Sequence, residues 1–305
     1  MTEQLALTKP EVPLRIDVGS ATHVGGRSEN EDAVDVGELP PVGTGEETSE
    51  GGFLLAVADG MGGYQRGEVA SNIAIETMRT MFAEDPGADV ALLLKQAFRR
   101  ANERIYESGL ATGPSAMMGT TLIVVATRGK YATIASIGDS RAYLARANRL
   151  TQITKDHSLV AEQVARGSMT AEEARESPHR NILTHALGHK PKLDAKMPNI
   201  FEITLLPEDR LLICTDGFFD VVPDDDLLRI VLEHPADEAA QLLVDTAVER
   251  GTSDNVSAVV AAVQPVRVAA PVPVGAGARP SYLLPAIALL VLVVVLAVVV
   301  FLLVT

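Results

Sequence analysis

The stretch FLLAVADGMGG (53–63) joins an apolar run of strand character to Asp59 and a glycine-bearing turn. Two other stretches also place an acidic turn beside an apolar run: RLLICTDGFFD (210–220), with Asp216, and GTSDNVSAVVAAV (251–263), with Asp254. Carboxylates at strand ends can converge at one edge of a sheet, where cations must neutralise their mutual repulsion. Hard divalent cations such as Mg²⁺ and Mn²⁺ prefer oxygen ligands of this kind. The three stretches therefore predict a carboxylate metal site and metal-assisted hydrolysis of an anionic ester.

The rest of the composition narrows the class of protein. The chain has 305 residues and a formal net charge of −14, and the sequence contains no Lys/Arg cluster and no tryptophan. A nucleic-acid partner requires a basic surface, so it is not expected. The single cysteine, Cys214, cannot form an intrachain disulfide, and its apolar surroundings indicate a small buried side chain rather than a nucleophile.

The C-terminal segment predicts a membrane anchor. Residues 282–304 contain no charged side chain, and a helix of that length spans about 34 Å, enough for the hydrocarbon core of a bilayer. Arg267 and Arg279 precede the segment, and basic residues beside a spanning helix favour the cytoplasmic side. The N-terminus lacks the pattern of a secretory signal peptide. We therefore expect a single-pass protein of the cell membrane whose catalytic domain is cytoplasmic.

Composition also divides the chain into segments. Residues 265–281 are rich in Pro, Gly, Ala and Val, which is typical of an extended linker. This leaves residues 1–264 as one domain of ordinary size.

Within that domain, apolar residues recur at helical spacing in some segments and as short strand-like runs in others. Helices are expected over 67–82, 90–108, 158–167, 170–177 and 238–251, and strands over 17–25, 53–59, 120–127, 131–138, 141–147, 201–205 and 210–215. Short connections predict two hairpins, one across Asp139 and Ser140 and one across PEDR (207–210). Helices in adjacent pairs and strands in adjacent runs favour antiparallel sheets flanked by helices.

Two further stretches carry charged residues of possible chemical use. In RSENEDA (27–33), Arg27 could hold a phosphate oxygen, and Glu31 or Asp32 could bind a metal ion or its waters. In IGDSRAYL (137–144), Asp139 lies between two apolar runs. Each stretch alone is also compatible with an ordinary charged turn.

Taken together and in order, these stretches resemble the metal-dependent protein phosphatases of the type 2C serine/threonine family. The resemblance extends from about Asp17 to Val263. The matching motifs are R-S-E-N-E-D, A-D-G-M-G-G, M-G-T-T (118–121), G-D-S-R, D-H-S (156–158), T-D-G and S-D-N-V-S. The segment 165–188 also resembles the flap of bacterial members. The resemblance implies an α+β fold: a four-layer sandwich of two antiparallel β-sheets with a pair of α-helices on each outer face, here followed by one transmembrane helix.

The resemblance also assigns roles to individual residues. It implies that Asp59 bridges two Mn²⁺ or Mg²⁺ ions, that Asp216 and Asp254 complete the first site, and that the Gly60 carbonyl and Glu31 serve the second. Asp32 would orient a metal-bound water, and Arg27 would bind the substrate phosphate. Asp139, with Asp216, matches a third, weaker metal position. The reaction implied is attack of a bridging water on phosphoserine or phosphothreonine of proteins, with a Ser/Thr kinase and its substrates as expected partners.

One position departs from many animal members of the family. They carry histidine after the Asp-Gly pair, where it could protonate the leaving group, whereas this chain carries Met61, as bacterial members commonly do. Methionine has no proton to donate. Two alternatives to a protein phosphatase stay open at this stage: a catalytically silent docking module with the same fold, and a two-metal hydrolase of small phosphate esters.

Overall fold

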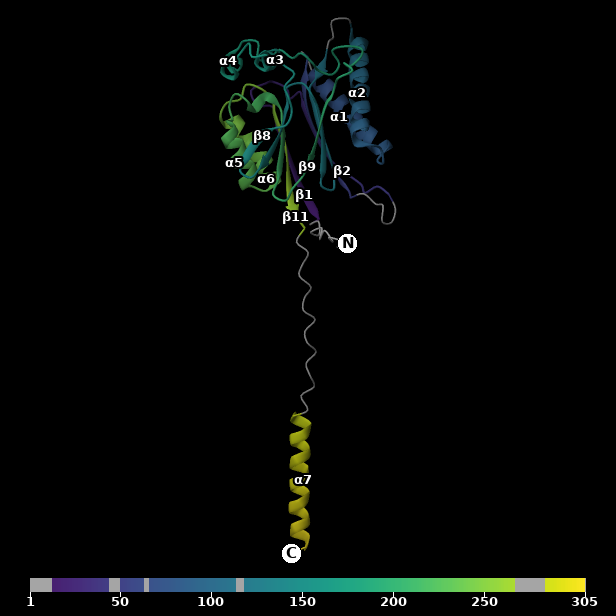
Figure 1. The fold of residues 1–305 in the computed structure, drawn as a ribbon, viewed down its shortest axis with the longest axis vertical. Coiled ribbons are helices and arrows are strands. Elements are labelled where there is room, and N and C mark those ends of the chain that lie inside the picture. Colours follow the sequence, from purple (N-terminus) through teal and green to yellow (C-terminus); the bar gives the residue numbers. More distant parts are fainter. Residues whose placement is uncertain (1–12, 44–49, 63–65, 114–117, 267–282, 305) are drawn as a thin grey trace, which may run out of the picture. The chain divides into compact units, whose positions relative to one another are not determined.

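The computed structural model describes residues 13–43, 50–62, 66–113, 118–266 and 283–304, with the side chains of the last segment described only at 287 and 290–300. Its contacts divide the chain into two units, Met1–Val266 and Arg267–Thr305. The first unit contains two β-sheets packed face to face, with helices on both outer faces (Figure 1). Most of the predicted linker lies outside the described residues.

Both sheets are antiparallel throughout. The first has the strand order β1-β11-β10-β7-β8 and the second β2-β3-β5-β6-β9, with β4 paired to β3. The first sheet contains β1 (Leu14–His23), β7 (Arg141–Arg146), β8 (Arg149–Gln152), β10 (Arg210–Cys214) and β11 (Val256–Pro265). The second contains β2 (Asp32–Leu39), β3 (Gly52–Met61), β4 (Gly119–Thr120), β5 (Leu122–Arg128), β6 (Tyr131–Ile137) and β9 (Asn199–Thr204).

The helices complete four layers. Helices α1 (Arg66–Glu84) and α2 (Val90–Thr112) cover the sheet that contains β3, and α5 (Asp224–Glu233) and α6 (Ala236–Glu249) cover the sheet that contains β10 (Figure 1). Two short helices, α3 (Leu159–Ala165) and α4 (Ala171–Glu176), lie in the connection between β8 and β9. The predicted sandwich with flanking helices is therefore confirmed.

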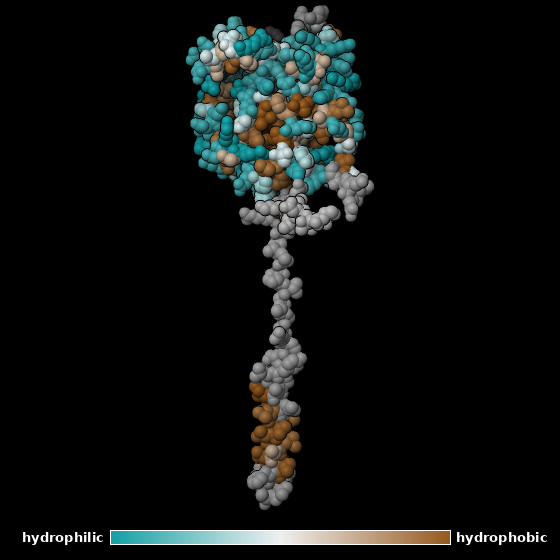
Figure 2. Space-filling view, in the orientation of Figure 1, coloured by the Kyte–Doolittle hydropathy of each residue, from teal (hydrophilic) through white to brown (hydrophobic). Residues whose placement is uncertain are grey.

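Alternation of side chains along the inner strands explains these layers. In β10, Leu211 and Ile213 pack between the two sheets, whereas Leu212 and Cys214 face α5 and α6. Successive strand residues point to opposite faces, so a strand buried on both faces is apolar throughout. Edge strand β9 is less covered, and its residues range from partly buried to exposed. Apolar surface is visible over the centre of the first unit in Figure 2.

Both predicted hairpins are wrong. Strand β6 pairs with β5 and β9, whereas β7 pairs with β10 and β8, so the connection through Asp139 passes from one sheet to the other. Likewise, β9 and β10 belong to different sheets. A short connection requires only that the two strands start and end near one another. In a sandwich the second strand can therefore lie in the facing sheet instead of beside the first strand.

Two further elements, strand β2 and helix α5, were not predicted from the sequence.

Helix α7 (Leu283–Val304) belongs to the second unit. Taking only what the structure describes, no helix of this chain is long and apolar enough to cross a membrane. The transmembrane helix that the sequence predicts over 282–304 stays a prediction.

Candidate metal centre

Five aspartates lie at one end of the sandwich, each beside the end of a strand. Asp59 in β3 pairs directly with Asp32, the first residue of β2. Asp139 lies in the connection between β6 and β7. Asp216 begins the 3-10 turn η2 (Asp216–Phe218) after β10, and Asp254 lies just before β11. Because β10 and β11 are antiparallel neighbours, the end of the first meets the start of the second.

The aspartates act on one another electrostatically. Burial raises the pKa of Asp59 well above its ordinary value, and the charges of Asp216 and Asp32 raise it further. Burial and then the charge of Asp216 raise the pKa of Asp139 to about 8. Burial and the charge of Asp254 raise the pKa of Asp216 to about 6, although a hydrogen bond with Asp59 opposes this rise. Carboxylates coupled in this way are stabilised in their ionised form by a nearby cation.

The acids at this end offer carboxylate oxygens, which suit a hard divalent cation. Within the described segments, no group of three or more His, Cys, Asp or Glu side chains is placed so that it could hold a metal ion. The ligand roles of Asp59, Asp139, Asp216 and Asp254 therefore stay predictions.

Asp32 supplies a buried oxygen that lacks a partner. Its Oδ2 accepts hydrogen bonds from the Thr215 hydroxyl (3.0 Å) and the Ser257 hydroxyl (2.7 Å). Its Oδ1 is buried and has no hydrogen-bond partner among the described residues. Burial raises the pKa of Asp32 to about 7, against the effect of the two hydroxyls. An unsatisfied buried carboxylate oxygen is rare in proteins and fits an ordered water or ion at this end of the sheet.

Glu31 and Gly60 lie together where β3 approaches α1. The Glu31 carbonyl accepts a hydrogen bond from the Gly60 N–H (3.2 Å), and its Oε1 accepts one from the Gly67 N–H (3.2 Å). A Cβ atom at Gly60 would stand 2.2 Å from the Gly67 carbonyl oxygen, so only glycine fits there. Burial raises the pKa of Glu31. The structure thus places Glu31 next to Gly60 and holds its carboxylate on the first turn of α1, and the ligand roles of these two residues stay predictions.

Arg27 is engaged with one of the acids. Its Nη2 donates a hydrogen bond of 2.6 Å to Oδ2 of Asp254, and its side chain is 53% exposed. The guanidinium is thus at the acidic end, and enough of it is open to solvent for a phosphate to reach it. Its role in binding phosphate stays a prediction.

Several residues that fix this end were missed from the sequence. Asn255 accepts from the Glu31 N–H (2.9 Å) and donates to the carbonyls of Val24 and Glu29, so it holds the loop that carries Arg27 against β11. The Thr121 hydroxyl accepts from the Asp59 N–H (3.0 Å) and lies 2.7 Å from the Ser140 hydroxyl.

Arg141 makes a third such link. Its guanidinium forms an ion pair with Asp156 (2.7 Å) and lies 3.7 Å from the centroid of the Phe219 ring. It thereby connects the Asp139 turn to the residues that follow Asp216. The family motifs quoted above include all three residues, Asn255, Thr121 and Arg141. Their hydrogen-bond and ion-pair partners are distant in the sequence, so the motifs alone did not reveal these contacts.

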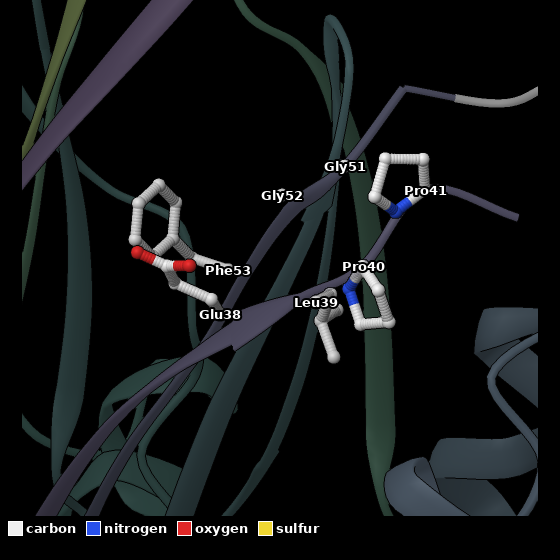
Figure 3. A pocket seen from close by; sticks show the side chains of 7 residues that line it. All are labelled: Glu38, Leu39, Pro40, Pro41, Gly51, Gly52 and Phe53. Carbon is white, nitrogen blue, oxygen red and sulfur yellow. The ribbon is translucent and has the colours of Figure 1, made fainter.

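A separate cavity of about 440 Å³ lies elsewhere and is lined by Glu38, Leu39, Pro40, Pro41, Gly51, Gly52 and Phe53 (Figure 3). It is at the far end of the β2–β3 pair, seven residues along each strand from Asp32 and Asp59. At ~3.4 Å per residue this separation is about 24 Å. The cavity is therefore not part of the acidic end.

The comparisons with known proteins agree with this fold and these motifs. The family model described as "Protein phosphatase 2C" matches residues 22–252. The serine/threonine protein phosphatase PstP of Mycobacterium tuberculosis is 38% identical over 212 residues, which are 69% of this chain and 40% of that protein. The chain thus spans about two fifths of the length of that relative. The serine/threonine phosphatase stp of Listeria welshimeri is 32% identical over 209 residues, 67% of this chain and 82% of that protein.

A solved phosphatase structure has the same fold as this chain. The catalytic domain of the serine threonine protein phosphatase PstP, in complex with two manganese ions, superposes with a TM-score of 0.68 and 34% identity, covering 83% of this chain and all of that one. The cations that the acidic end suits are therefore those used by such phosphatases, Mn²⁺ or Mg²⁺. With a family model that matches most of the chain and relatives above 30% identity, the chain belongs to the protein phosphatase 2C family.

Proposed function

We propose that this protein hydrolyses phosphoserine and phosphothreonine in other proteins. The observation that carries the proposal is the set of electrostatically coupled aspartates at one end of the sandwich, with Arg27 beside them. Membership of the phosphatase family supports it.

The cation ligands would be Asp59, Asp216 and Asp254, with the Gly60 carbonyl and Glu31 toward α1 and Asp139 for a third ion. Bound divalent cations supply two things in this chemistry: they lower the pKa of a water molecule and neutralise charge on the phosphate.

The chain's own residues do the remaining work. Arg27 has donors in a planar fork that can hold two phosphate oxygens, and it can leave Asp254 because half of its side chain is exposed. Asp32 has both hydroxyl partners on Oδ2, so Oδ1 remains to accept a hydrogen bond from the attacking water and to orient it.

Nucleophilic attack by cysteine does not fit this structure. Cys214 is fully buried, with no accessible surface. Burial raises the pKa of its thiol to about 12. A thiol with that pKa is almost entirely protonated near neutral pH, and thiols react as thiolates. Direct attack by water is therefore the route that these residues support.

The test is a phosphatase assay on residues 1–266, the compact first unit. Metal-free protein should hydrolyse a phosphothreonine peptide only after Mn²⁺ or Mg²⁺ is added. The variant Asp225→Asn, which removes an exposed acid at the start of α5, is a matched control for charge and should keep full activity. Undiminished turnover in excess chelator would falsify the metal-dependent mechanism. Activity on small phosphate esters alone would favour the alternative substrate class.

We further propose that residues 282–304 anchor the protein in the cell membrane, with residues 1–280 in the cytoplasm. The uncharged sequence of this segment supports the proposal. An anchor would concentrate the catalytic domain near membrane-bound kinases or their substrates.

Fractionation tests the anchor, and protease protection tests the orientation. Full-length protein should stay with membranes in carbonate buffer, and residues 1–266 should not. Release of the full-length protein would refute the anchor. Digestion of the domain by protease added outside sealed cells would refute the cytoplasmic orientation.

A further inference from the structure

Cleavage of a phosphoserine or phosphothreonine leaves an alkoxide, which is a poor leaving group unless it receives a proton. The residue after Asp59 and Gly60 is Met61, and its thioether cannot supply one. The inference below rests on the proposed function and concerns where this proton comes from.

A histidine from a distant loop lies next to Met61 in space. Met61 pairs directly with Gly119 across β3 and β4. Directly opposed residues in an antiparallel pair project their side chains from the same face, with Cβ atoms about 5 Å apart. Gly119 has no side chain, and a Cβ built there would stand 2.9 Å from Nδ1 of His189. The imidazole of His189 therefore occupies the side-chain position opposite Met61.

The backbone on both sides of His189 is fixed by one buried side chain. Asn102 of α2 is 1% exposed. Its Oδ1 accepts a hydrogen bond from the Gly188 N–H (3.0 Å), and its Nδ2 donates to the Lys190 carbonyl (3.0 Å). Both polar atoms of the Asn102 amide thus form hydrogen bonds with the residues on either side of His189. A buried amide with both ends satisfied holds a loop in one conformation.

A second contact fixes the same loop at Gly188. This residue has φ of +83°, and a Cβ there would stand 2.3 Å from the Ile105 side chain. Only glycine combines that conformation with that approach. The loop before His189 is therefore held tightly against α2.

Other histidines of the same region are less suited to donate a proton to the leaving group. His157 is buried, its Nδ1 accepts from the Gly138 N–H, and its Nε2 lies 2.8 Å from the Asn199 amide. His185 packs edge-on against His157. His179 is exposed, and its described hydrogen bonds involve its backbone. His189 is exposed as well, so it can exchange protons with solvent, but unlike His179 it adjoins β4, the strand that pairs with the end of β3 just after Asp59.

We propose that His189 is the proton donor to the leaving alkoxide. In this step the oxygen of a water molecule forms a bond to phosphorus, and that water gives up one proton to solvent. The bond from phosphorus to the serine or threonine oxygen breaks, and its electron pair stays on that oxygen. A ring N–H of protonated His189 transfers its proton to the oxygen, which gives the free hydroxyl and neutral imidazole. Solvent then returns a proton to the ring, so the step balances.

The experiment compares substrates that differ in their need for the proton. Wild type, His189→Gln and the matched control His179→Gln are assayed as full-length protein in detergent with Mn²⁺, on a phosphothreonine peptide and on p-nitrophenyl phosphate. For His189→Gln we expect kcat on the peptide to fall on the order of 10²-fold, and kcat on the aryl ester to change little, since nitrophenolate leaves without protonation. His179→Gln should match wild type on both.

A series of aryl phosphates makes the test independent of peptide binding. The logarithm of kcat should fall more steeply with leaving-group basicity in His189→Gln than in wild type. Parallel slopes, or equal losses on peptide and aryl ester, would overturn the assignment. If wild type hydrolyses neither substrate, the proposed function fails instead, so the two failures are distinguishable.

Discussion

His157 makes the stability of this domain dependent on pH. The residue is 7% exposed. Its Nδ1 accepts from the Gly138 N–H, and its backbone bonds to Gly138 and Thr184. It thus joins the turn before Asp139 to the segment that follows α4. Burial, and then the nearby His185, lower the pKa of His157 from 6.5 to about 4. The folded protein therefore holds this imidazole neutral.

The sign of the effect follows from proton uptake. Between the folded value of about 4 and the unfolded value of 6.5, the unfolded chain binds a proton at His157 that the folded protein does not. The stabilisation is therefore complete above about pH 6.5 and is lost as pH falls toward about 4. Integrated from pH about 7.5 to about 5, the loss is about 2 kcal/mol.

Denaturant unfolding of residues 1–266 in chelator, at pH about 7.5 and at pH about 5, measures this loss in the free energy of unfolding. Wild type and His157→Gln carry the same buried aspartates, so the difference between them isolates the histidine. We expect wild type to lose about 2 kcal/mol more than His157→Gln between the two pH values. Equal losses in the two proteins would refute the assignment of a buried neutral imidazole.

Four substitutions test the acidic end itself. Asp59→Asn should abolish metal-dependent turnover, and Asp139→Asn should slow it less, as measured by kcat on a phosphothreonine peptide; near-normal rates in Asp59→Asn would show that the centre is assigned wrongly. Arg27→Ala should lower kcat/KM roughly 10- to 100-fold, mainly through KM, because it removes a charged hydrogen bond worth about 1.5–3 kcal/mol; an unchanged KM would argue against phosphate binding. Gly60→Ala should destabilise the domain by about 1–3 kcal/mol, because its Cβ meets the Gly67 carbonyl; an unchanged denaturation midpoint would contradict this.

The parts of the fold that were predictable are those set by side-chain periodicity. Helices expected over 67–82 and 90–108 are found as α1 and α2, since their apolar stripes face the sheet. Strand β2 was missed because its acids and glycine interrupt the apolar pattern at the edge of its sheet, where most of its residues are only partly buried or exposed. The two hairpins failed for a different reason. A short connection limits the distance between two strands, but the choice between neighbouring and facing sheets depends on the whole topology.

The acidic end was predictable only as a set of positions. Strand-end aspartates follow from local sequence, whereas the hydrogen bond of Arg27 to Asp254 depends on β1 and β11 being neighbours. The same holds for His189, whose approach to Gly119 requires a bridge between Thr120 and Leu187. No spacing in the sequence indicates such a contact.

The acidic end also shows how the fold tolerates a destabilising cluster of charge. Mutual repulsion among buried carboxylates opposes folding, and the surrounding residues offset it through fixed hydrogen bonds. Thr215 and Ser257 donate to Asp32, and the Asp59 N–H is held by Thr121. Ser257 lies in β11 and Thr215 directly follows β10, and both strands are buried along most of their length, so Asp32 is held beside a well-packed part of the domain. A divalent cation bound among these acids would neutralise part of this repulsion and so stabilise the folded domain.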